Sequence, residues 1–134
     1  MTKTQNDRIR RHQLMTSEIR RGIPPLGSQT MAADPIAHAK YFDITTDERW
    51  FVLEFDGVDT LRCLYVGSWV TYMDVSLHEL DARATVGRVG CPTVERDLYW
   101  DIAPVSEIVT TYGAGLPIVH QHRPNTQDVL SLSR

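Results

Sequence analysis

The fold is decided by residues 36–75, IAHAKYFDITTDERWFVLEFDGVDTLRCLYVGSWVTYMDV. Four segments of this stretch are rich in β-branched and aromatic residues and are bounded by turn residues, which is typical of strands. The segments are Ile36–Phe42, Trp50–Phe55, Leu61–Val66 and Trp69–Val75. The links between them are short, so neighbouring segments should run antiparallel, since parallel pairs need long crossovers. The stretch therefore predicts a four-stranded antiparallel meander.

Upstream of the meander, the sequence predicts one amino-terminal helix. Thr4 and Asp7 have the spacing of a capping pair, and Gly22 followed by two prolines stops helix growth. We therefore expect a helix over about 5–21, with one narrow apolar stripe at helical spacing. The stripe consists of Ile9, His12, Met15 and Ile19.

Downstream, two short helices and a fifth strand are expected. Ser76 opens a helix to about Arg83, residues 94–100 form a strand, and Pro104 starts a last helix that Gly113 ends. The chain then reads as one α+β domain built on a mostly antiparallel sheet. It comprises a basic helix (1–22), an α+β core (23–117) and a mobile tail (118–134).

Charge is divided unevenly along the 134 residues. The whole chain has a net charge of −3, but residues 1–22 carry +4 and the remainder −7. Such asymmetry fits an arm for an anionic partner, or a basic helix that packs on its own acidic body. The sequence shows no apolar stretch typical of a secretory signal or a membrane span, so we expect a cytoplasmic protein without membrane contact.

The middle of the chain resembles the bacterial domain-of-unknown-function family 2958. The blocks that carry the resemblance are IPPL (23–26), DPIAHAKYF (34–42), WFVLEFDG (50–57), SLHEL (76–80), VERDLYW (94–100) and PVSEI (104–108). One departure lies at residues 62–74, where family members have a more glycine-rich stretch. The resemblance implies a compact bacterial cytoplasmic domain carried on plasmids or other mobile elements. It implies no activity.

One group of residues suggests chemistry at the start of the meander. If the first two strands pair as a hairpin, His38 and Glu54 become cross-strand neighbours, with Asp34 and Asp56 toward the same edge. Imidazole and carboxylate groups that converge can bind a divalent metal or transfer protons. The alternative is a polar sheet edge without chemistry. The strand register decides between them, because a slip of one residue separates the pair.

A second group, Glu95, Arg96 and Asp97, lies on the predicted fifth strand. Alternation places the two carboxylates on one face and Arg96 on the other. A half-buried arginine needs carboxylate partners, and Glu54 or Glu107 could serve in a structural network. The same arginine could instead bind a phosphate or carboxylate ligand.

The amino-terminal arginines are the third candidate. Arg8, Arg10 and Arg11 could follow a phosphate backbone from one face of a helix. The −7 charge of the remaining chain would repel the same polyanion.

Three functions therefore stay open. The first is a non-enzymatic accessory protein of a mobile element or phage that binds a host or element protein, with counter-defence as one use. The second is a small hydrolase or phosphoesterase that uses Asp34, His38, Glu54 and Asp56. The third is a nucleic-acid-binding accessory. No cofactor is expected, except a divalent metal in the hydrolase case.

Overall fold

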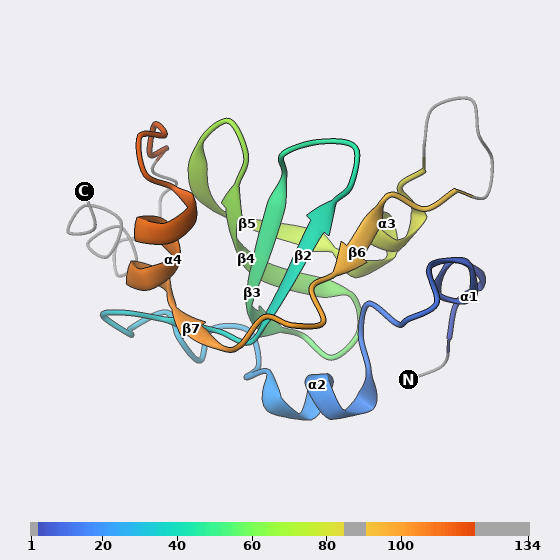
Figure 1. The fold of residues 1–134 in the computed structure, drawn as a ribbon. Coiled ribbons are helices and arrows are strands. Elements are labelled where there is room, and N and C mark those ends of the chain that lie inside the picture. The colour runs from blue at the N-terminus through green and yellow to red at the C-terminus, as the bar shows by residue number, and fades with distance from the viewer. Residues whose placement is uncertain (1–2, 85–90, 120–134) are drawn as a thin grey trace.

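One antiparallel sheet organises the chain, as a computed structural model that describes residues 3–84 and 91–119 shows (Figure 1). Its strands lie in the order β5-β4-β3-β2-β6, and a small second sheet pairs β1 with β7. The strands are β1 (Ile36–Ala37), β2 (Ala39–Asp43), β3 (Arg49–Phe55), β4 (Thr60–Val66), β5 (Val70–Ser76), β6 (Val94–Arg96) and β7 (Ala103–Pro104). The helices are α1 (Gln5–Arg10), α2 (Ser17–Gly22), α3 (Leu77–Ala82) and α4 (Val105–Tyr112).

The predicted meander is confirmed as β2-β3-β4-β5, and the α+β class with it. Two strands are shorter than expected. The first segment divides at His38, so that β1 leaves the large sheet to pair with β7, and the fifth strand ends at Arg96 instead of residue 100. The tail expected over 118–134 lies outside the described residues, except for Ile118 and Val119. Ile118 forms a parallel bridge with Val70 of β5.

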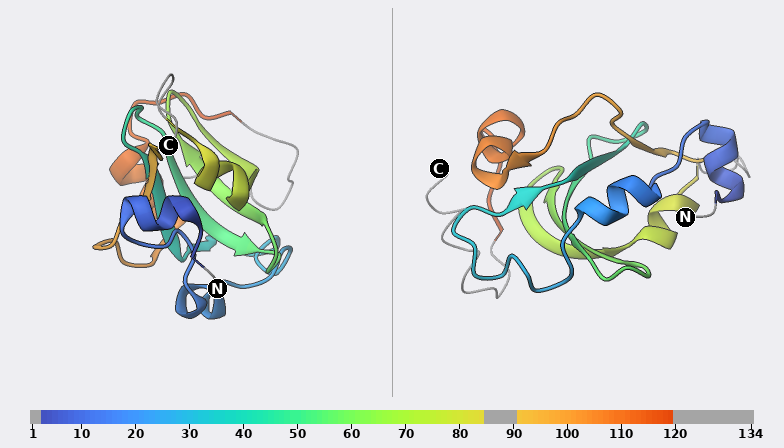
Figure 2. Two further views of the ribbon diagram at one scale, coloured as in Figure 1. Left: turned by 90° about the vertical axis from the view of Figure 1, so that its right-hand side faces the viewer. Right: turned by 90° about the horizontal axis from the view of Figure 1, so that it is seen from below.

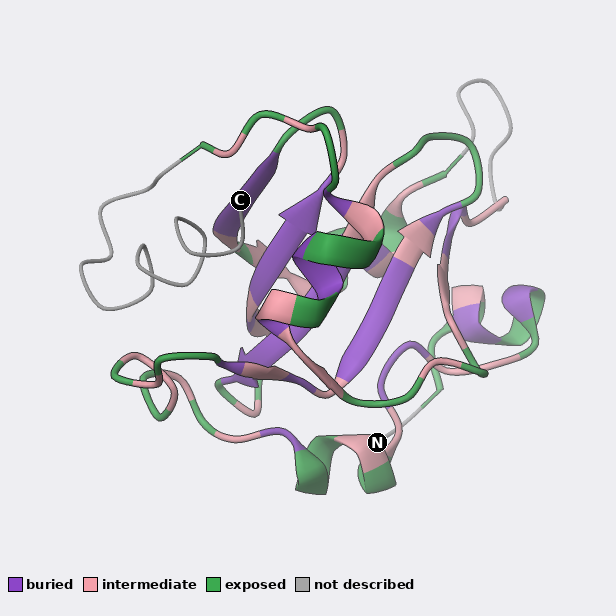
Figure 3. Cartoon of the chain, turned by 60° about the vertical axis from the view of Figure 1, so that its left-hand side comes forward, coloured by how far each residue is buried: buried purple, intermediate pink, exposed green. Residues whose placement is uncertain are grey.

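Each face of the sheet carries its own buried cluster, because the strands place apolar side chains on both faces. On one face, α4 contributes Val105, Ile108 and Val109. On the other face, Leu80 of α3 packs with residues from the amino-terminal segment. The two views of Figure 2 place α3 and α4 on opposite sides of the sheet. Figure 3 shows that the strands are largely buried, whereas much of α2 is not. None of the helices in 3–84 and 91–119 has the length and apolar character to cross a bilayer.

The single amino-terminal helix predicted over 5–21 is wrong. The predicted Thr4–Asp7 capping box is present, but α1 ends at Arg10, because Arg11 adopts a left-handed backbone with a φ of 67°. The chain then turns inward, and α2 starts afresh with Thr16 as its cap. The break changes which residues are buried: Leu14 and Met15 enter the core, while Ile9 is 47% exposed.

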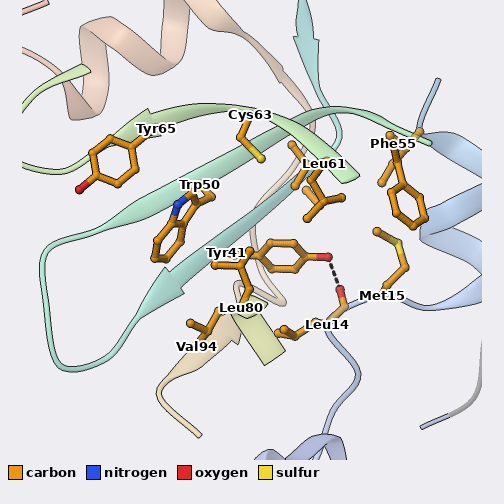
Figure 4. Packing of buried hydrophobic residues seen from close by; sticks show 13 residues of the cluster. Leu14, Met15, Tyr41, Trp50, Phe55, Leu61, Cys63, Tyr65, Leu80 and Val94 are labelled. Atoms are coloured by element: carbon orange, nitrogen blue, oxygen red, sulfur yellow. Dashed lines mark hydrogen bonds between the residues drawn. The ribbon is translucent and has the colours of Figure 1, made fainter. Parts of the chain in front are cut away.

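The segment between α1 and α2 completes one of the two clusters (Figure 4). The hydroxyl of Tyr41, a fully buried residue of β2, donates a hydrogen bond of 2.5 Å to the carbonyl of Leu14. Met15 packs in the same cluster as Phe55 and Leu61. Burial raises the pKa of Tyr41 far above its ordinary value, so the phenol remains a neutral donor. The amino-terminal segment is therefore part of the core.

Arg10 joins three elements that are far apart in sequence. Its side chain is 1% exposed, and its Nη1 lies 2.6 Å from Asp7 Oδ1 and 2.8 Å from Asp81 Oδ1. Its Nε donates to the carbonyl of Val94 in β6 at 2.8 Å. A buried guanidinium with two carboxylates and a carbonyl has its charge and its donors satisfied.

We predict that Arg10→Ala lowers the free energy of unfolding by about 3–5 kcal/mol, because it leaves two poorly solvated carboxylates without a counter-charge. Arg8→Ala is the matched control: Arg8 is exposed, and its loss should change stability by no more than about 0.5 kcal/mol. Urea denaturation followed by circular dichroism measures both. Equal effects of the two substitutions would contradict the structural role of Arg10.

Candidate functional site

The three carboxylates of the predicted hydrolase site each have separate structural partners. Asp34 accepts hydrogen bonds from the backbone N–H and the hydroxyl of Ser106, at the start of α4. Asp56 accepts three backbone N–H bonds in the β3–β4 turn, and these hydrogen bonds lower its pKa. His38 has a lowered pKa because it is partly buried. Asp34 and Asp56 thus have local structural roles at two different places.

Glu54 has a structural environment of its own. It is 1% exposed, and its carboxylate accepts from the backbone N–H groups of Gly27 (2.9 Å) and Gln29 (2.6 Å). Arg62 of β4 also donates to it at 3.2 Å. Glu54 therefore fixes the connector over 23–35 to the sheet. Since Ala39 pairs with Val52, continuing that register sets Leu53, and not Glu54, opposite His38.

A metal site does not emerge from these residues. Within 3–84 and 91–119, no three His, Cys, Asp or Glu side chains are grouped so that they could hold a metal ion. His120 and His122 lie outside the described residues. The hydrolase hypothesis thus gains no support from the positions of these residues. Arg10 is buried, so it gives no support to the nucleic-acid hypothesis either. Arg8 and Arg11 are exposed.

The second predicted group, Glu95, Arg96 and Asp97, does line a hollow. We call it the β6 hollow; its volume is about 370 Å³. It lies beside β2 and β6, under the β2–β3 turn. The lining residues are His12, Lys40, Phe42, Asp43, Thr46, Asp47, Glu48, Arg49, Glu95, Arg96, Asp97, Leu98 and Tyr99.

Arg96 does not have the partners expected from the sequence. Its Nε donates to the carbonyl of Gln13 at 2.9 Å, instead of to Glu54 or Glu107. Its backbone N–H donates to Nε2 of His12 at 3.0 Å. Burial, and then the charge of Arg96, lower the pKa of His12, so the imidazole is neutral and can accept this bond near pH 7. These contacts cover the outer edge of β6 with residues of the amino-terminal segment.

Lys40 provides the cation of the hollow that is most firmly held. Its Nζ lies 3.1 Å from Asp97 Oδ2 and is 4.7 Å from the ring centroid of Tyr112. The guanidinium carbon of Arg49 lies 5.4 Å from the centroid of the same ring. Lys40 and Arg49 thus both lie over the ring of Tyr112, and Asp97 pairs with Lys40. These contacts fix the positions of the two cations beside the hollow.

Two apolar side chains at the rim are exposed. Leu98 is 53% exposed and Tyr99 95%, both on the chain that follows β6. The Asp97 carboxylate accepts from the backbone N–H of Tyr99 at 3.0 Å, which fixes the start of this loop. The rim thus combines large apolar surface with neighbouring charges. Sequence reasoning missed Tyr99, because it assigned residues 94–100 to a strand.

An ion-pair network forms the wall behind the hollow. Arg83 lies 2.9 Å from both Asp43 Oδ2 and Glu48 Oε1. Burial alone would raise the pKa of Asp43, but hydrogen bonds from Thr45 and Thr93 and the charge of Arg83 lower it overall. Burial alone would likewise raise the pKa of Glu48, but the hydrogen bonds that its carboxylate accepts from Arg83 and Tyr65 lower it overall. Both carboxylates are therefore ionised at neutral pH.

We predict that acid weakens the fold partly through this network. A carboxylate whose pKa is depressed by folding contributes stability above its unfolded pKa, and the contribution is lost as pH falls through the folded value. For Asp43 and Glu48 the loss begins near their ordinary values of 3.8 and 4.5 and continues below them. Arg83→Gln should therefore flatten the decline of unfolding free energy below about pH 4. Arg21→Gln, at an exposed arginine, is the control and should not; identical slopes would contradict the role of the network.

Comparison with known proteins adds no independent assignment. No family model, curated protein or solved structure matches the chain. The relation to family 2958 therefore stays a prediction from the sequence blocks.

Proposed function

We propose that the protein is a non-enzymatic binding module that holds a basic segment of another protein in the β6 hollow. The observation that carries the proposal is Tyr99, a large aromatic residue at 95% exposure on the rim of an acidic hollow. Tyrosine is enriched at protein interfaces, because it offers a large rigid contact area and a polar hydroxyl.

The charge of the lining supports a basic occupant. Five carboxylate residues face three cationic ones around the hollow. Lys40 pairs with Asp97, and Arg83 pairs with both Asp43 and Glu48, so one positive charge faces two negative ones there. No ion pair within the described residues is recorded for Glu95 and Asp47, nor for Arg49 and Arg96, and the excess of carboxylates in the lining is two. Opposite charges across an interface increase the association rate and select the partner.

The apolar rim supports a macromolecular occupant. Leu98 and Ile102, at 53% and 64% exposure, continue the exposed surface of Tyr99 along the loop between β6 and β7. Aromatic residues are enriched at protein interfaces, and neighbouring exposed apolar side chains mark a surface that binds another protein. A small anion would be repelled by the excess of carboxylates and would not cover the exposed apolar side chains.

The resemblance to family 2958 adds an expectation about the partner. If the protein is carried on a mobile element, the basic segment belongs to a host or element protein, and blocking it serves counter-defence. Basic segments of this kind commonly contact nucleic acid, so an acidic module can occupy a site intended for a polyanion.

We predict that Tyr99→Ser weakens binding of a basic peptide by about 2 kcal/mol, roughly thirty-fold, since the aromatic anchor of an interface carries a large share of the affinity. Glu95→Lys should also weaken it, by reversing one charge of the lining. Fluorescence anisotropy with a peptide library of fixed length and graded net charge measures the effect.

Val58→Ser is the matched control. Val58 is 79% exposed, but it lies in the β3–β4 turn, at the end of β3 opposite the hollow. It should leave binding unchanged. The proposal fails if the tightest peptides are acidic or neutral, or if Tyr99→Ser and Val58→Ser have the same effect.

A further inference from the structure

The outer edge of β6 is covered by side chains of the amino-terminal segment. β6 ends the strand order β5-β4-β3-β2-β6, so no further strand of the described residues lies beside it. Two of its backbone groups are satisfied there. The carbonyl of Val94 accepts from Arg10 Nε at 2.8 Å, and the N–H of Arg96 donates to His12 Nε2 at 3.0 Å. Because an uncovered strand edge can pair with another chain, this cover protects the sheet.

The contact made by His12 requires a neutral imidazole. A neutral ring has one nitrogen that accepts and one that donates, whereas an imidazolium has two donors and no acceptor. Nε2 accepts from Arg96. A hydrogen bond with the backbone of Arg10 raises the pKa of the ring, as expected of a ring N–H that donates to a carbonyl. The two contacts together assign the proton to Nδ1, and a second proton on Nε2 would face the N–H of Arg96.

The surroundings of His12 also favour the neutral ring. Burial is the largest cause of its lowered pKa, and the charge of Arg96 is the next. Glu95 of β6 acts in the opposite direction, while Arg10 of α1 acts in the same direction as Arg96. The other charged side chains that line the same hollow are Lys40, Asp43, Asp47, Glu48, Arg49 and Asp97. Protonation of His12 therefore costs a contact and adds a cation near two arginines.

We propose that His12 is a proton-sensitive latch on the outer edge of β6. The neutral ring holds the N–H of Arg96, and the protonated ring releases it. The opening is local, because Arg10 keeps its ion pairs with Asp7 and Asp81 and so still fixes α1 to the body. His12 and Arg96 both line the β6 hollow, so the latch acts on the wall of that hollow.

Opening of the latch changes the hollow in two ways. Arg96 lies between Glu95 and Asp97 in the chain, so a loosened backbone at Arg96 loosens the position of both carboxylates. The protonated His12 also adds one positive charge to a lining in which carboxylates exceed cationic residues by two. A basic segment should therefore bind less tightly in acid, and this consequence, unlike the latch itself, rests on the proposed function.

Amide hydrogen exchange of Arg96 in the full chain measures the latch directly. In the open state His12 binds a proton near its ordinary pKa of 6.5, whereas in the closed state it does so only at lower pH. Opening therefore becomes more favourable as pH falls below 6.5, by at most about tenfold per pH unit for one proton, and levels off once the closed ring is protonated. The protection factor of the Arg96 amide should fall between pH 7 and pH 5, relative to the amides of β3.

Two substitutions at His12 separate the proton from the contact. His12→Gln keeps an oxygen that can accept from Arg96 but does not titrate, so the Arg96 amide should be equally protected at both pH values. His12→Ala removes the acceptor, so protection should be lower than in the wild type already at pH 7. His38→Gln is the matched control: His38 is another half-buried histidine with a lowered pKa, and its loss should leave the pH dependence at Arg96 unchanged.

Three results would overturn the inference: equal protection of the wild-type Arg96 amide at pH 7 and pH 5, a pH dependence that survives in His12→Gln, or one that disappears in His38→Gln. Binding of a lysine-rich peptide with blocked termini is measured at the same two pH values. The wild-type affinity should fall by about two- to five-fold in acid, and that of His12→Gln should not. If no basic peptide binds at either pH, the proposed function fails, while exchange at Arg96 still decides the latch.

Discussion

The buried guanidinium of Arg10 is the contact on which the arrangement of the molecule depends. It links α1 through Asp7, α3 through Asp81 and β6 through the carbonyl of Val94. A charge with a side chain 1% exposed is tolerated only when its partners are in place, so these three elements must assemble together. The same contact begins the cover over the outer edge of β6, which would otherwise present unpaired backbone groups.

Ion pairs within the fold also determine which charged side chains can still interact with a partner. Arg10 pairs with Asp81, and this ion pair joins the basic amino terminus to the acidic remainder of the chain. Lys40 and Arg83 pair with carboxylates inside that remainder. Two neighbouring cavities, the β6 hollow and a second one lined by residues of β5 and α3, have more carboxylates than cationic side chains in their linings. The Asp43–Glu48–Arg83 network separates them and gives each one a rigid wall.

The meander was predictable from the sequence, because residues 36–75 contain strand segments joined by links too short for anything but antiparallel pairs. The prediction of a single helix over 5–21 was wrong, because the chain forms two helices there. Its stripe of four residues was narrow, and burial of Leu14 and Met15 against the sheet favoured a break at Arg11. The spacing of apolar residues along the sequence does not show how much stability the chain gains by packing Leu14 and Met15 against the sheet.

The candidate sites show the same limit. Glu95, Arg96 and Asp97 all line the β6 hollow, although alternation along a strand would place Arg96 on the other face, and Asp97 lies beyond the end of β6. The partners of Arg96 lie 83 and 84 residues away in the chain and are a carbonyl and an imidazole. The expectation that a half-buried arginine pairs with a carboxylate could not have identified these two partners. Glu54 shows the importance of register, because one position of β3 decides whether it meets His38 or the connector.

The central claim is that the basic amino-terminal segment belongs to the core and is not an arm held ready for a partner. Native-state hydrogen exchange of the isolated protein tests it most directly. The account predicts that the amides of Leu14 and Arg10 exchange with opening free energies close to those of β3 and β4. Exchange of these amides at rates near those of an unstructured chain, with the sheet still protected, would contradict it.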